Sequence, residues 1–150
     1  MYRRAGISLV AFCAAAALST AVGPPSAAAA EQAAPGRAPQ TVLVDCLWNP
    51  EVRPSDFMLA CGDGNSRLAS LKWTQWGTEA ARAEGVNWVN DCTPYCAAGR
   101  FHGYPVKVLL DQPQSWKKQP GTTHYARITL VYPDDRPAGY GQTMSYPLWD

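Results

Sequence analysis

Histidine is scarce in this sequence, and the local motifs that commonly mark catalysis are missing. Only two histidines, His102 and His124, occur in 150 residues. The chain contains no G-x-S-x-G nucleophile elbow, no H-E-x-x-H zinc motif and no glycine-rich phosphate loop. A Ser-His-acid triad would need a histidine beside a serine and a carboxylate, and no local pattern supplies one. The sequence therefore favours a protein that is not an enzyme and that uses no cofactor and no metal.

An excess of charge of one sign is also missing. The chain carries 13 basic and 12 acidic residues. Arg3 and Arg4 belong to the N-terminal leader described next, and without them 11 basic residues remain against 12 acidic ones. Proteins that bind DNA or RNA usually concentrate lysine and arginine on one surface. The composition therefore predicts no nucleic-acid partner.

The only long apolar run lies at the N-terminus. Two arginines precede an apolar stretch over residues 7–22, and three alanines at 28–30 fit the small-residue pattern of a signal-peptide cleavage site. The stretch is shorter than the roughly 20 apolar residues that a membrane span needs. Acylation at Cys13 is disfavoured because the bulky Phe12 precedes it. We therefore expect residues 1–30 to be a cleaved signal peptide, the protein to be secreted, and no membrane span to remain.

Removal of the leader leaves four cysteines, Cys46, Cys61, Cys92 and Cys96. An even number of cysteines in a small secreted chain is typical of disulfides. A zinc site usually needs two tight cysteine pairs, but 14 residues separate Cys46 from Cys61, and Cys92-x-x-x-Cys96 is one residue wider than a redox C-x-x-C motif. Four cysteines allow three pairings. We favour a bond between Cys46 and Cys61, because both lie at inward-facing positions of successive strand candidates. We favour a second bond between Cys92, which ends a strand candidate, and Cys96, which lies in the turn after it.

The rest of the chain indicates an all-β fold. Residues 31–40 contain two prolines and no apolar period, so we expect a flexible linker there, followed by a single domain over 41–150. Short alternating runs rich in β-branched and aromatic residues occupy 41–48, 55–61, 68–76, 85–92, 104–110 and 124–132, with a seventh candidate at 139–149. Alternation predicts that the inward residues are Tyr104, Val106, Val108 and Leu110 in one run and Ala126, Ile128, Leu130 and Tyr132 in another. Gly, Pro, Asn or Asp separates these runs, as in antiparallel sandwiches. We predict a monomeric β-sandwich of immunoglobulin-like architecture with about six to seven strands.

Several Cys, Trp and Gly positions occur in a familiar order. The matching segments are ACGDGN at 60–65, LKWTQWG at 71–77, NDCTPYCAAG at 90–99 and YPV at 104–106. They resemble a group of small secreted actinobacterial proteins without an established activity, and the resemblance covers about residues 45–132. It implies export and a compact disulfide-bonded domain. It implies no reaction and no ligand.

Tryptophan is the unusual part of the composition, with six residues. By strand parity, Trp73 and Trp88 are expected in the core. Trp76 lies three positions after Trp73, so it is either exposed or turned inward by a bulge near residues 74–75. Trp116 occupies a polar stretch where burial is difficult. We interpret Trp76 and Trp116 as ligand-binding candidates, with a cell-wall glycan or an extracellular protein as the partner.

Two other functions compete with a secreted or envelope-associated binding module. The first is a small hydrolase whose site is assembled across loops from Asp45, Asp91 and His102, which would require a shared pocket and raised carboxylate pKa values. The second is an extracellular protease inhibitor that presents the loop between Cys92 and Cys96.

Overall fold

The structure is a computed structural model that describes residues 40–149. These residues belong to one compact unit. The expected signal peptide at 1–30 and the expected linker up to residue 39 lie outside the described residues. The account below therefore concerns the expected β-domain.

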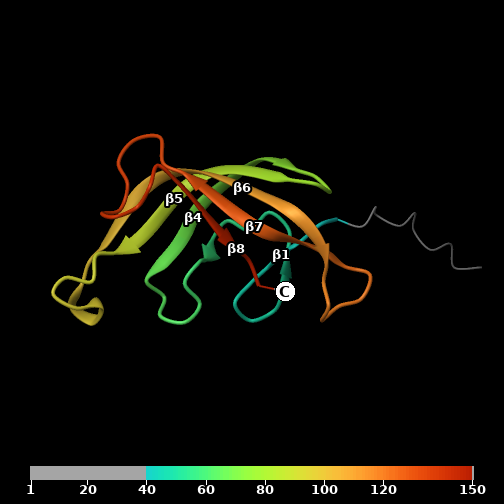
Figure 1. Ribbon diagram of the computed structural model, residues 1–150, viewed down its shortest axis with the longest axis horizontal. Helices are drawn as coiled ribbons and strands as arrows, with labels where there is room; N and C mark the ends of the chain where they lie inside the picture. Colours follow the sequence, from blue (N-terminus) through green and yellow to red (C-terminus); the bar gives the residue numbers. More distant parts are fainter. Residues whose placement is uncertain (1–39, 150) are drawn as a thin grey trace, which may run out of the picture. The chain divides into compact units, whose positions relative to one another are not determined.

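A six-stranded antiparallel sheet forms the body of the domain (Figure 1). Its strands pair in the order β3–β4–β5–β6–β7–β8, so each strand lies beside the one that precedes it in the sequence. The strands are β3 Phe57–Met58, β4 Ser66–Trp76, β5 Ala81–Asn90, β6 Phe101–Ser115, β7 Thr123–Val131 and β8 Thr143–Pro147. A single 3-10 turn, η1 Cys96–Ala98, lies between β5 and β6.

The N-terminal segment covers one face of this sheet. It contains a two-stranded sheet of β1 Leu43–Val44 and β2 Pro50–Glu51. Before β1, Val42 pairs with β7, because its N–H donates to the Thr123 carbonyl and its carbonyl accepts from the Tyr125 N–H. Figure 1 shows this segment in teal, beneath the strands of the main sheet. The covered face is therefore the core face.

The central strands have the predicted alternation. Val106, Val108 and Leu110 of β6 and Ile128 and Leu130 of β7 are each at most 3% exposed. Their side chains point to the core face, since residues two apart in a strand share a face. The predicted inward positions of β6 and β7 are thus confirmed.

The predicted parity of β5 is wrong. The buried residues of β5 include Ala81, Ala83 and Asn87, the last with no exposed surface, so Trp88 lies on the opposite face. Trp88 pairs with Gly103 across the sheet, and a Cβ on that glycine would lie only 3.2 Å from the indole. The glycine therefore leaves room for the indole on the outer face, which the sequence of β5 alone does not indicate.

The predicted all-β class is confirmed, with antiparallel sheets of two and six strands. The seventh candidate run forms β8. The connectivity differs from an immunoglobulin domain, in which Greek-key connections carry strands between two sheets. Here the strands follow one another in sequence order, because short connections join sequential strands as neighbours in one sheet.

Both favoured disulfides are present. Cys46 pairs with Cys61, their Cα atoms 5.5 Å apart, and this bond joins the N-terminal segment to the loop before β4. Cys92 pairs with Cys96 and closes a small ring at the tip of the β5–β6 hairpin. The cysteines therefore serve the architecture, as predicted.

Candidate functional site

A cavity of about 300 Å³ lies on the core face of the main sheet. The sheet contributes Ile128 and Leu130 of β7 to its apolar lining, while Leu59 and Leu148 close it from the segments after β3 and β8. Small-molecule sites are typically concave, mostly apolar and supplied with a few polar groups. We therefore treat this space as the candidate site and call it the Asn87 cavity.

Its polar floor is a hydrogen-bonded chain of three side chains. The Asn87 Nδ2 donates to the Tyr132 hydroxyl oxygen at 2.8 Å, and the Ser66 hydroxyl donates to Asn87 Oδ1 at 3.1 Å. Asn87 and Ser66 line the cavity, whereas Tyr132 is fully buried behind them. Asparagine is depleted in strands, and an amide buried among apolar side chains is costly unless it is hydrogen-bonded. The two hydroxyls therefore allow β5 to hold an amide in its core face.

Aromatic side chains form one wall of the cavity. Tyr140, Tyr146 and Trp149 line the cavity. The Trp149 ring stacks on Phe57, and its Nε1 donates to the Asp45 carbonyl at 3.0 Å. Burial, followed by the neighbouring phenol of Tyr140, raises the pKa of Tyr146 to about 12. Its hydroxyl therefore stays protonated, and neutral, at physiological pH.

The lining residues favour a neutral ligand. Among the described residues, no Asp, Glu, Lys, Arg or His side chain lines the Asn87 cavity. A charged group placed here would lose its hydration without gaining a partner of opposite charge. The arrangement suits binding of a molecule with an apolar body and one uncharged polar end.

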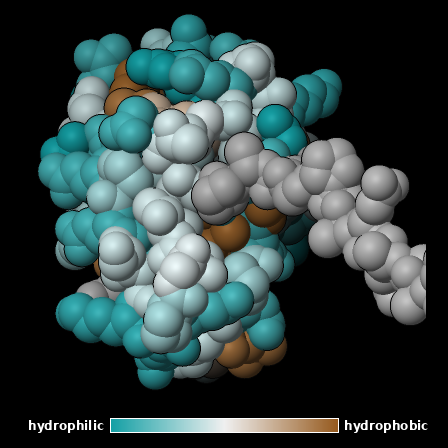
Figure 2. Space-filling model, turned by 90° about the vertical axis from the view of Figure 1, so that its right-hand side faces the viewer, coloured by the Kyte–Doolittle hydropathy of each residue, from teal (hydrophilic) through white to brown (hydrophobic). Residues whose placement is uncertain are grey.

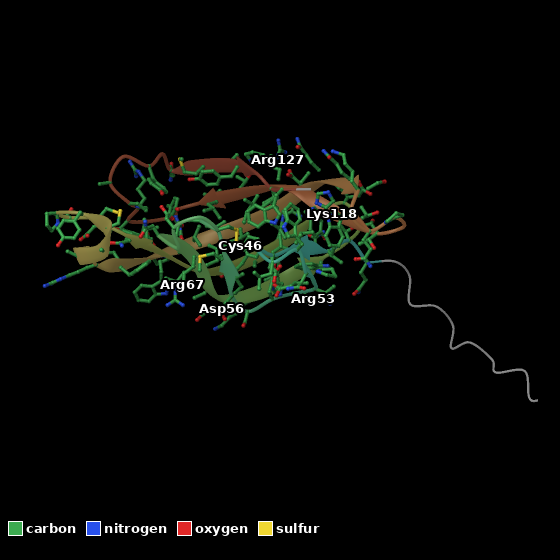
Figure 3. The ribbon with its side chains drawn as sticks, turned by 90° about the horizontal axis from the view of Figure 1, so that it is seen from below. Cys46, Arg53, Asp56, Arg67, Lys118 and Arg127 are labelled. Atoms are coloured by element: carbon green, nitrogen blue, oxygen red, sulfur yellow. A yellow bond between two sulfur atoms is a disulfide. The ribbon has the colours of Figure 1, made fainter. Side chains whose placement is uncertain are left out.

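A second depression, of about 320 Å³, lies beside the Cys46–Cys61 bond and is lined by Asp56, Glu51 and Arg67 among others. Figure 3 shows Cys46, Asp56 and Arg67 together on the side of the N-terminal segment. Burial and the nearby Asp45 charge raise the pKa of Glu51. This depression is more open than the Asn87 cavity and lacks a buried polar floor.

Trp76 is turned inward by a bulge. The pairing of β4 with β5 shifts register between Trp73 and Gln75, which is the bulge that the sequence left as one of two alternatives. The Trp76 indole packs edge-on against Trp73 and Tyr125, with ring centroids 4.5 and 5.5 Å away, and its Nε1 donates to the Thr41 carbonyl. Trp76 is half-buried and contributes to the core.

Trp116 does not occupy the exposed position that a surface contact requires. It is 4% exposed and packs with Val42 and Val44, because the N-terminal segment covers it. Figure 2 shows one face of the molecule, on which hydrophobic residues form small separate areas among hydrophilic ones. The structure therefore does not bring Trp76 and Trp116 together as an open groove.

Two of the three residues considered for hydrolysis do meet. The Asp91 carboxylate lies 2.9 Å from His102 Nε2 and accepts hydrogen bonds from the N–H groups of Arg100 and Thr93. These bonds lower the pKa of Asp91 to about 2, the Arg100 N–H contributing most. Asp45 instead accepts hydrogen bonds from Asn49 and Leu47 in its own loop. Burial acts to raise the pKa of Asp45, but these bonds together outweigh it and lower the pKa. The raised carboxylate pKa values that the hydrolase hypothesis requires are not found at these two residues.

The residues of the Asn87 cavity were missed by reasoning from the sequence. An asparagine in the middle of an apolar strand was the available signal for Asn87. The two hydroxyls that hold it come from β4 and from the residue that follows β7, 21 and 45 residues away in the chain. Such a cluster becomes visible only when the strand register is known.

Comparison with known proteins provides no relative. No family model, no curated protein and no solved structure matches the chain. Within residues 40–149, no helix has the length and apolar character needed to cross a membrane. In the same part of the chain, no group of three or more His, Cys, Asp or Glu side chains could hold a metal ion.

Proposed function

We propose that the chain is a secreted, non-catalytic binding module and that its ligand occupies the Asn87 cavity. The observation that carries this proposal is a cavity of about 300 Å³ with a largely apolar lining that includes Tyr140, Tyr146 and Trp149. Small-molecule sites are typically concave and mostly apolar with a few polar groups, and this lining has that character.

The experiment uses small neutral probes and a variant that fills the cavity. Indole and ethylbenzene are titrated into the purified domain, and binding is followed by ligand-observed NMR. Ala60 lines the cavity, so Ala60→Phe is expected to abolish binding, whereas Ala98→Phe on the exposed 3-10 turn is the matched control. Equal binding to both variants would place the probes elsewhere and contradict the proposal.

Secretion rests on the N-terminal pattern and agrees with the two disulfides, which persist in oxidising compartments. We expect the exported protein to begin at Glu31. Mass spectrometry of the culture-medium fraction tests this, and retention of residues 1–30 would contradict cleavage.

Protease inhibition is a second candidate, favoured by the loop at the tip of the β5–β6 hairpin. Tyr95 is 64% exposed there, while the Cys92–Cys96 bond fixes the loop around it. The Asn90 amide adds bonds to the Cys92 N–H and the Cys96 carbonyl. Rigid presentation of an aromatic side chain lowers the entropic cost of binding a protein. A panel of secreted endopeptidases, assayed with wild type and Tyr95→Ala, tests this role, which fails if no enzyme is inhibited.

A further inference from the structure

The depression beside the Cys46–Cys61 bond carries charge, which the Asn87 cavity does not. Its lining includes three carboxylates, those of Asp45, Glu51 and Asp56, against one guanidinium, that of Arg67. We call this space, of about 320 Å³, the Glu51 depression. The charges that line it are therefore mostly negative.

The Glu51 carboxylate lacks a partner that would balance its charge. Among the described residues, no N–H or O–H group donates to it and no cation pairs with it. Burial, followed by the charge of Asp45, raises the pKa of Glu51. A bound cation would offset both effects, because an opposite charge nearby favours the ionised form of a carboxylate.

Exposed apolar side chains concentrate around the same depression. Six large apolar side chains are exposed among the described residues, and four of these lie within residues 47–58. Leu47, which is 78% exposed, and Met58 line the depression, while Trp48 and Val52 directly follow lining residues in the chain. Apolar surface beside polar groups is typical of an interaction site. The surroundings therefore favour a partner that brings apolar side chains as well as positive charge.

Two sheet edges border the Glu51 depression. Glu51 belongs to β2, the second strand of the two-stranded sheet, whereas Phe57 and Met58 form β3, the edge strand of the main sheet. Edge strands can pair with an extended segment of another chain. The Cys46–Cys61 bond holds the N-terminal segment against the loop before β4, and a fixed site loses less entropy on binding.

From these features we propose that the Glu51 depression binds an extended segment of another polypeptide in which arginine or lysine alternates with apolar residues. The basic side chains pair with Glu51 and Asp56, and the apolar ones lie against Leu47 and Met58. An acidic segment is rejected, because like charges across an interface repel. The Glu51 depression and the Asn87 cavity have no lining residue in common, so this inference does not depend on the ligand proposed for the cavity.

Three capped pentapeptides test the chemistry of the partner. The first alternates valine with arginine, the second has citrulline in place of arginine, and the third has glycine in place of valine. Citrulline keeps the shape of arginine but not its charge. We expect the first peptide to bind about 10-fold more tightly than either of the others, since charge-assisted hydrogen bonds and apolar contacts both contribute. NMR titration of the isotope-labelled protein gives the dissociation constants, and the largest amide shifts are expected at the residues that line the depression.

Two variants with matched controls test the residues. Glu51→Gln removes the charge at constant size, and Glu79→Gln in the exposed turn between β4 and β5 is its control. We expect Glu51→Gln to weaken the arginine peptide about threefold and to leave the citrulline peptide unchanged, and Glu79→Gln to change neither. Leu47→Ser should also weaken the arginine peptide, whereas Phe101→Ser, at an exposed apolar residue of the β5–β6 hairpin, should not. Because Leu47 is exposed, this second variant keeps the test usable should Glu51→Gln fail to fold.

Each contrary outcome has a definite meaning. If the arginine peptide does not bind, or binds no better than its citrulline analogue, the proposal is wrong. It is equally wrong if the amide shifts concentrate away from the depression, or if Glu51→Gln and Glu79→Gln have the same affinity. Concentration-dependent dimerisation of wild type that Leu47→Ser abolishes would assign the depression to a second copy of the chain and overturn the choice of partner.

Discussion

The indole of Trp149 stacks on the ring of Phe57, with centroids 5.8 Å apart and planes inclined by only 10°. This contact joins the C-terminal segment to the first strand of the main sheet. The same indole lines the Asn87 cavity and donates to the Asp45 carbonyl, 104 residues away in the chain. One side chain therefore holds the cavity wall and the N-terminal segment in place together.

Removing this indole is expected to lower the stability of the domain. Trp149→Ala loses the stack on Phe57 and the hydrogen bond to Asp45, which should lower the free energy of unfolding by about 2–3 kcal/mol. Urea denaturation measures the loss. Trp48→Ala is the control, because Trp48 is 41% exposed and contacts the Lys118 ammonium group at 3.9 Å. It should cost less than about 1 kcal/mol, and equal losses in the two variants would contradict the role given to Trp149.

The two disulfides are expected to contribute unequally to stability. They span 15 and 4 positions of sequence, and a larger closed loop restricts the unfolded chain more strongly. Replacing Cys46 and Cys61 by alanine should cost about 3 kcal/mol, whereas replacing Cys92 and Cys96 should cost about 2 kcal/mol. Chemical denaturation of the two double variants tests this order. A reversed order would show that the hairpin tip contributes more to folding than its ring size implies.

Gly85 is expected to be required by close packing in the sheet. A Cβ at this position would lie 2.9 Å from the Ala69 carbonyl oxygen, beside a second register shift of β4, between Ala69 and Lys72. Because backbone cannot move aside easily, Gly85→Ala should destabilise the domain by about 1–3 kcal/mol. Gly62→Ala is the matched control, since nothing lies within 4 Å of its Cβ position. Thermal unfolding that shifts equally in both variants would contradict this explanation.

Asp91 is expected to make the domain sensitive to acid. Its folded pKa of about 2 lies below the ordinary value of 3.8. The stabilisation from this carboxylate is therefore present above about pH 4 and is lost as the pH falls through about 2. The unfolding midpoint of wild type should thus fall more steeply over this range than that of Asp91→Asn. Asp134→Asn, an exposed carboxylate in another loop, should behave like wild type, and parallel profiles for wild type and Asp91→Asn would refute the assignment.

The all-β class and the positions of the central strands could be predicted from the sequence, because apolar and polar residues alternate regularly in β6 and β7. Val106, Val108 and Leu110 are predicted and observed on the core face. The inward turn of Trp76 was also foreseen as one alternative, since a spacing of three from Trp73 places both indoles on one face only through a bulge. These features depend on neighbours along the chain.

The cavity and the placement of Trp116 depend on neighbours across the fold. The sequence predicted that Trp88, the largest apolar residue of β5, faces the core. Instead the small residues Ala81 and Ala83 lie on the core face. Likewise, Trp116 is buried by Val42 and Val44, more than 70 positions earlier in the sequence. The hydrophobic pattern of one strand does not indicate which distant segment of the chain will cover that strand.

The sequential order of the main sheet has a kinetic consequence. Each hairpin can form from adjacent segments, so most of the sheet assembles through short loops. Covering the core face depends instead on a long-range contact, because Trp149 must reach Asp45, near the other end of the described residues. The sheet should therefore form first, and its apolar core face should remain hydrated until both terminal segments dock on it. Pulsed hydrogen exchange during refolding should then show β5 and β6 protected before β1 and β8.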